Sequence, residues 1–88
     1  MSTAYQVILP RPVKKQLDEL PSLMRDRVAL AVADLAGDPR PYGSRKLVGM
    51  DQWRLRVGGY RIIYRIDDAA HVVTIGWIGP RRDAYKGN

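Results

Sequence analysis

The sequence has no cysteine, which excludes disulfide bonds and thiolate metal sites. Its single histidine, His71, is too little for a histidine metal centre or a Ser-His-Asp triad, so we expect no metal and no other cofactor. No apolar run approaches the roughly 18 residues of a membrane span, and no charged-then-apolar leader is visible. These absences favour a soluble cytoplasmic protein that works in a reducing compartment.

Positive charge is in excess and unevenly placed. Fifteen Lys and Arg residues stand against nine Asp and Glu, a net charge of +6. Residues 45–88 hold nine of the basic and only four of the acidic side chains. A basic half-domain predicts a polyanionic partner, either nucleic acid or an acidic protein. The alternative is that this charge serves solubility alone.

The first half of the chain predicts a strand followed by two helices. Residues 4–9 have the composition of a strand, which Pro10 ends. Apolar residues then recur at helical spacing from residue 12 to residue 36, interrupted by Pro21, which predicts a helical hairpin with one apolar face. Gly37 is a suitable C-cap for the second helix. Residues 38–52 are rich in proline and glycine and predict a long loop, with a short strand near residues 46–48.

The second half predicts an antiparallel three-strand meander. The strands are Trp53–Val57, Tyr60–Asp67 and Val72–Ile78, with His71 in the second turn, where we expect it to be solvated. Eighty-eight residues suit a single domain, residues 1–88, with one two-layer core. The predicted fold is therefore α+β: an N-terminal strand, a helical hairpin and a meander, with both helices on one face of the sheet.

The Gly58-Gly59 dipeptide sets the register of the first two meander strands. A two-residue turn, in which both glycines accept positive φ, pairs Arg56 with Arg61. Alternate strand residues face opposite sides of a sheet. One face is then almost purely apolar and suits the helices: Trp53, Leu55, Val57, Tyr60, Ile62, Tyr64 and Ile66. The other face carries four basic residues: Arg54, Arg56, Arg61 and Arg65.

Two arginines directly opposite one another destabilise a sheet by some tenths of a kcal/mol. A phosphate bound by Arg56 and Arg61 would explain the arrangement, because the guanidinium fork matches phosphate oxygens. The alternative is a solvated polar face whose charges are screened by salt. In either case we expect exposed arginines here, which can be replaced at little cost in stability.

The run from Trp53 to Asp68, WRLRVGGYRIIYRIDD, resembles the W-R-[LI]-R-x-G-x-Y-R-[VI]-[IL]-Y pattern of the RelE/ParE toxins. The segment from Ile78 to Tyr85, IGPRRDAY, is similar to the closing I-x-x-R-[RE]-x-x-Y of that family. The loop from Asp38 to Gly49 resembles the one that precedes the family's sheet. The resemblance spans nearly the whole chain.

This resemblance implies a toxin of a type II toxin–antitoxin system, with a cognate antitoxin that offers an acidic, amphipathic segment. RelE-like members bind the ribosome and cut mRNA, and the 2′-OH of the RNA attacks the adjacent phosphate. The RelE pattern implies five catalytic positions: Arg54, Arg56, Arg61, Arg81 and Tyr85. Further basic residues are expected to contact RNA: Lys46, Arg65 and Arg82.

Two other classes of function remain open. ParE-like members share the fold, lack the basic set and inhibit DNA gyrase. A basic face could also exist only to bind an acidic protein. One departure from RelE matters, because RelE has lysines where Arg54 and Arg56 stand, and arginine cannot act as a general base. Proton transfer would then fall to Lys46, to Tyr85 or to a ribosomal group.

Overall fold

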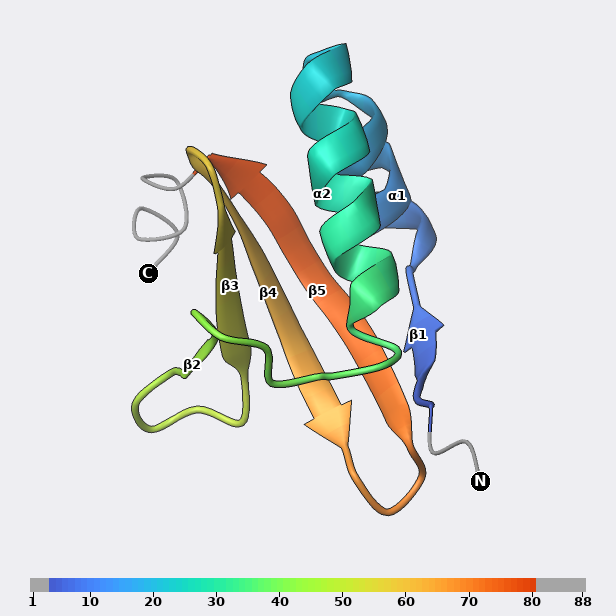
Figure 1. The fold of residues 1–88 in the computed structure, drawn as a ribbon, viewed down its shortest axis with the longest axis vertical. Helices are drawn as coiled ribbons and strands as arrows, with labels where there is room; N and C mark the ends of the chain where they lie inside the picture. The colour runs from blue at the N-terminus through green and yellow to red at the C-terminus, as the bar shows by residue number, and fades with distance from the viewer. Residues whose placement is uncertain (1–3, 81–88) are drawn as a thin grey trace.

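The computed structural model describes residues 4–80. Its elements are β1 (Gln6–Ile8), α1 (Arg11–Asp18), α2 (Ser22–Asp34), β2 (Arg45–Lys46), β3 (Trp53–Val57), β4 (Tyr60–Asp67) and β5 (Val72–Pro80). The five strands form one sheet in the order β1-β5-β4-β3-β2, and the two helices lie side by side against it (Figure 1). The predicted α+β fold is confirmed.

The meander matches its prediction closely. Strands β3 and β4 have the expected bounds, and β5 runs two residues further, to Pro80. The short strand β2 lies at Arg45–Lys46, slightly earlier than expected, and pairs antiparallel with β3. Strand β1 pairs parallel with β5, with Val7 opposite Val73. The sheet is therefore mixed and has five strands, two more than the meander alone.

Both helices begin directly after a proline. Pro10 and Pro21 occupy the N-cap positions of α1 and α2, where a missing backbone N–H costs nothing. The expected cap at Gly37 is wrong: α2 ends at Asp34, its C-cap is Leu35, whose backbone is right-handed, and the Gly37 N–H donates to the Asp34 carbonyl at 3.1 Å. Three successive hydrogen bonds, each from an N–H to the carbonyl three residues earlier, thus replace the left-handed cap. No helix within residues 4–80 is long and apolar enough to cross a membrane.

The core lies between the helices and one face of the sheet. Helix α1 contacts β5, and α2 contacts β3 and β4. The core side chains come from both layers: Val13, Leu17, Leu20, Val28, Val32, Leu35, Leu55, Ile62, Tyr64, Val73, Ile75 and Ile78. The loop after α2 crosses the sheet on the helix side (Figure 1), where the Tyr64 hydroxyl donates to the Pro39 carbonyl at 2.8 Å. Burial raises the pKa of Tyr64 to about 12, so the phenol remains a donor.

A polar network joins three distant segments at the end of the sheet where β4 turns into β5. Asp68, in that turn, accepts two hydrogen bonds from the Arg40 guanidinium, at 3.2 and 2.8 Å, and one from the Tyr5 hydroxyl at 2.6 Å. The Tyr5 ring stacks on His71, with centroids 4.6 Å apart. His71 is exposed in the turn, as predicted. These contacts attach the α2–β2 loop and the N-terminal segment to the β4–β5 turn.

We predict that this network makes stability depend on pH in the acid range. The hydrogen bonds from Arg40 and then Tyr5 lower the pKa of Asp68 from 3.8 to about 2. Because the folded-state pKa is depressed, the contribution is complete above about pH 4 and is lost as the pH falls toward 2. The melting temperature of Asp68→Asn should therefore lie below that of the wild type at pH 7 and approach it by pH 2.

The same comparison in an Arg40→Ala background is the control. There the Asp68→Asn substitution should have a much smaller effect, because its main partner is already gone. A melting-temperature difference that stays constant from pH 7 to pH 2 would contradict the assignment.

Candidate functional site

The sheet face turned away from the helices, here called the outer face, gathers the arginines as predicted. Arg56 pairs with Arg61 across the β3–β4 hairpin, and Arg54 pairs with Ile63. The intervening residues Leu55 and Ile62 are buried in the core, so the arginines alternate to the other side. Arg54, Arg56 and Arg61 therefore share one face, and Arg56 lies directly opposite Arg61.

The hairpin turn depends on Gly58. Gly58 has a φ of +59°, whereas Gly59 does not have positive φ, so the expectation of two such glycines is wrong. Positive φ at only the first central residue is the pattern of a type II′ turn, which matches the twist of the two strands. A Cβ at Gly58 would also lie 3.0 Å from the Met24 side chain of α2. The backbone conformation favours glycine here, and a Cβ would in addition displace the terminal methyl group of Met24.

The arginines differ sharply in exposure, and the expectation that all of them are exposed is wrong. Arg56 is exposed and Arg54 half-buried, but Arg61 is only 1% exposed. Arg61 lies on the central strand β4, opposite Gly79 of β5. A Cβ on Gly79 would lie 2.6 Å from the Trp77 indole, so the ring occupies the space beside Arg61 that a side chain at position 79 would fill. Arg61 is thus a buried cation next to an exposed one.

Burial changes what Arg61 can do. A charged side chain is seldom fully buried in a protein unless it is paired, and both Arg54 and Arg61 interact with other groups of the chain. A charge in a medium of lower dielectric acts more strongly on a neighbouring anion than a charge in water does. Arg56 therefore offers a solvent-accessible fork, and Arg61 a fixed positive charge behind it.

The other predicted site residues are placed as follows. Arg65 is exposed on the outer face and pairs with Thr74. Lys46 pairs with Trp53, so the register places it on the helix-facing side of β2, away from the arginines. Three predicted residues lie outside the described residues: Arg81, Arg82 and Tyr85.

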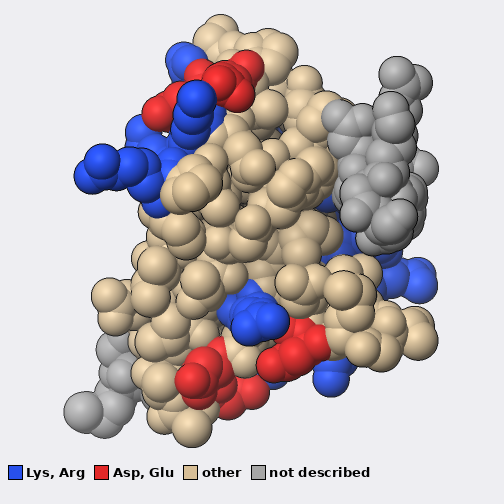
Figure 2. Space-filling model, turned by 180° about the vertical axis from the view of Figure 1, so that it is seen from behind, with Lys and Arg blue, Asp and Glu red and all other residues tan. Residues whose placement is uncertain are grey.

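Arg45 also lies on the outer face, a position that was not predicted from the sequence. It pairs with Arg54 on β2 and so extends the basic row of β3 toward the sheet edge. Strand parity could have found it, had the short strand been placed at residues 45–46 instead of 46–48. In Figure 2, which views the molecule from behind, basic side chains are visible on the side of the sheet that β3 forms and also at the upper end of the helical hairpin.

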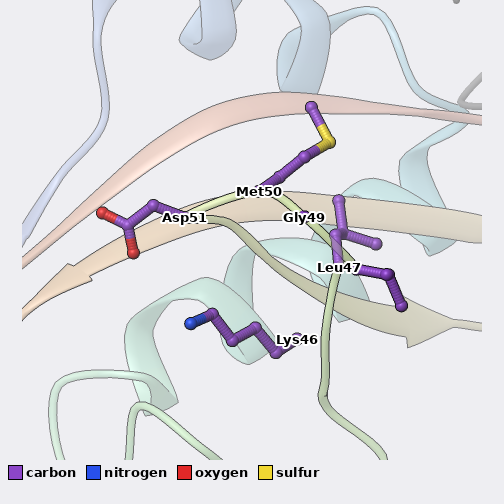
Figure 3. Close-up of a pocket in the computed structure, with 6 residues that line it drawn as sticks. Lys46, Leu47, Gly49, Met50 and Asp51 are labelled. Atoms are coloured by element: carbon purple, nitrogen blue, oxygen red, sulfur yellow. The ribbon is translucent and has the colours of Figure 1, made fainter.

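Two hollows lie near the site. One, of about 560 Å³, lies within the β2–β3 loop, residues 46–51. In Figure 3 the Lys46 and Asp51 side chains reach toward the same side of that loop, whereas Met50 points away from Lys46. This hollow contains none of the outer-face arginines.

The second hollow, of about 370 Å³, is here called the bulge basin. It lies at a bulge where the β4–β5 register shifts after Ile63, so that Trp77 pairs with Ile63 but Ile75 pairs with Tyr64. Its lining residues are Pro10, Pro12, Val13, Gln52, Tyr64, Arg65, Thr74, Ile75 and Gly76. Within residues 4–80 no group of three or more His, Cys, Asp or Glu side chains is arranged to hold a metal ion.

Comparison with known proteins identifies the family. A family model described as "ParE toxin of type II toxin-antitoxin system, parDE" matches residues 7–85. The chain belongs to the RelE/ParE toxin superfamily. It is 33% identical over 86 residues to toxin RelG of Mycobacterium tuberculosis, covering 93% of this chain and 97% of RelG.

Two solved toxin–antitoxin complexes contain chains with the same fold. A chain of the archaeal RelE–RelB complex from Pyrococcus horikoshii matches with a TM-score of 0.79 and 31% identity, covering 89% of this toxin and 96% of that chain. A chain of the RelBE2 complex from Mycobacterium tuberculosis matches with a TM-score of 0.78 and 27% identity, covering 89% of this toxin and 99% of that chain. The family model thus carries the ParE name, whereas these similar proteins carry Rel names.

We predict that the two facing arginines respond oppositely to removal. Arg61→Ala should lower the free energy of unfolding by about 1–3 kcal/mol, because it empties a buried site. Relief of the charge repulsion offsets only about a few tenths of a kcal/mol of this loss. Arg56→Ala should change it by less than about 0.5 kcal/mol, because Arg56 is exposed. Urea unfolding at constant salt measures both, and equal losses would contradict the assigned burial.

Proposed function

We propose that this toxin is a ribosome-dependent endoribonuclease that cuts mRNA and so inhibits translation. The observation that carries the proposal is the pairing of Arg56 with Arg61, flanked by Arg54, on one face of the sheet. The repulsion between these side chains weakens the sheet, and a bound polyanion would offset it. RNA supplies both that polyanion and, in its 2′-OH, an internal nucleophile.

The arginines would act on the phosphate next to the attacking 2′-OH. As the oxygen–phosphorus bond forms, negative charge grows on the phosphoryl oxygens and on the departing 5′ oxygen. The Arg56 fork can hold those oxygens in line with the nucleophile. Arg61, already fixed and removed from water, would stabilise the developing charge without reorganisation. DNA, which lacks the 2′-OH, should not be cut.

A group other than these arginines must move the protons, because arginine stays protonated at neutral pH. Lys46 is poorly placed for this role, since its register partner is Trp53 on the other side of the sheet. Tyr85, which the family pattern pairs with Arg81, is therefore the side chain we propose, and a ribosomal group is the alternative.

The relatives support the nuclease over the gyrase inhibitor. The matched complexes are named RelBE2 and RelE–RelB and the relative is toxin RelG, whereas the ParE name comes from the family model. The RelE–RelB and RelBE2 complexes also support a cognate antitoxin for this toxin. We propose that an acidic, amphipathic segment of this antitoxin covers residues 45–88, the basic half of the toxin. Both proteins would act in the cytoplasm.

We predict that Arg56→Ala lowers the single-turnover rate of cleavage of ribosome-bound mRNA by ~100-fold, the scale of losing one preorganised donor. Arg81→Ala should do the same. Arg11→Ala, an exposed arginine on α1, is the matched control and should cleave as the wild type does. His71→Ala should also be silent.

The tyrosine tests the proton route in the same assay. Tyr85→Phe should be as slow as Tyr85→Ala if the phenol moves a proton, and close to the wild type if the ring only stacks on a base. Full activity in Arg56→Ala would mean that the site is elsewhere. A wild type that cuts no mRNA but inhibits DNA gyrase would replace the nuclease by the ParE-like function.

A further inference from the structure

Trp77 is an aromatic side chain on a face that is otherwise rich in arginine. It is half-buried on the outer face of β5, opposite Ile63 and two residues before Gly79. An indole is a large apolar surface, and here it is not in the core, which lies on the opposite face of the sheet. The position of this ring calls for a reason beyond core packing.

Gly79 determines where the indole lies. A Cβ at that position would lie 2.6 Å from Cζ2, 2.7 Å from Cη2 and 3.3 Å from Cε2 of the Trp77 ring. Real Cβ atoms do not approach other atoms so closely, so any residue but glycine would push the ring aside. The glycine therefore lets the benzene half of the indole lie along β5, next to Arg61.

A hollow lies one residue away from Trp77 along β5. Gly76, the residue before it, lines the bulge basin, which has a volume of about 370 Å³. Gln52, Arg65 and Thr74 also line this basin and offer an amide, a guanidinium and a hydroxyl group. These polar groups, close to Trp77 along the sheet, could bind other parts of a nucleotide whose base stacks on the indole.

We propose that Trp77 is a stacking platform for the nucleobase next to the phosphate held at Arg56 and Arg61. The inference rests on the proposed function and adds how the toxin holds its substrate. Protein–RNA recognition commonly pairs an aromatic ring for an unstacked base with cations for the phosphate. Stacking tolerates any base, because every base has a π face, so the platform would position the RNA without selecting its sequence.

Binding of a short single-stranded 2′-O-methyl oligonucleotide, which cannot be cut, tests the platform. The matched probe has the same length and charge but is abasic throughout. Wild-type protein should bind the intact oligonucleotide more tightly than the abasic one. Trp77→Leu should lose roughly 5- to 150-fold in affinity for the intact probe, the range for one base–aromatic stack, and little for the abasic one.

Two further variants report on the ring itself. Gly79→Ala keeps the tryptophan but displaces it, and should weaken binding of the intact probe as Trp77→Leu does. In a Trp53→Phe background, Trp77 is the only tryptophan, and its fluorescence should be quenched by the intact probe and much less by the abasic probe. The first comparison does not depend on this background.

Three results would overturn the platform: equal binding of both probes by the wild type, no binding of either, or an equal loss for both probes in Trp77→Leu. The last would mean that the indole only covers Arg61. The proposed nuclease is judged separately, by cleavage of ribosome-bound mRNA by the wild type. Base-dependent binding without cleavage would support the Trp77 platform and contradict the nuclease proposal. Cleavage with base-independent binding would support the nuclease and contradict the platform.

Discussion

The register of the β3–β4 hairpin determines the chemistry of both faces of this toxin. Because side chains alternate along a strand, a slip of one residue would move the arginines into the core and the apolar residues into water. Gly58 prevents that slip, since its positive φ allows a two-residue turn and its missing Cβ leaves room for Met24 of α2. The turn thereby places Arg56 opposite Arg61 and keeps the two charges together.

The pair is asymmetric, and this asymmetry gives the site its character. Arg56 reaches solvent, whereas Arg61 is enclosed on the central strand with the Trp77 indole beside it. The stem of a buried arginine packs like an apolar side chain, which can offset the few tenths of a kcal/mol of repulsion with its neighbour. What remains is a buried positive charge beside an exposed one, an arrangement suited to a phosphate whose charge increases during a reaction.

Patterns local in sequence predicted most of the fold, and long-range packing accounts for what they missed. The bounds of β3 and β4 and all five of their residue pairs could be predicted, because one turn and a period of two determine them. The parallel pairing of β1 with β5 could not, since no local signal links residues so far apart. Strand parity placed Arg61 on the correct face, but the hairpin alone could not predict its burial, because Arg61 also pairs with Gly79 of β5, whose register includes a bulge.

Thermal unfolding with inorganic pyrophosphate decides whether the facing arginines form an anion site. A ligand that binds only the folded state at ten times its Kd stabilises that state by about 1.4 kcal/mol. At constant ionic strength, the wild type should therefore melt several degrees higher as pyrophosphate replaces chloride. Arg56→Ala should lose this rise while keeping its melting temperature in chloride. An equal rise in Arg56→Ala and in the wild type would mean that the facing arginines are not the anion site.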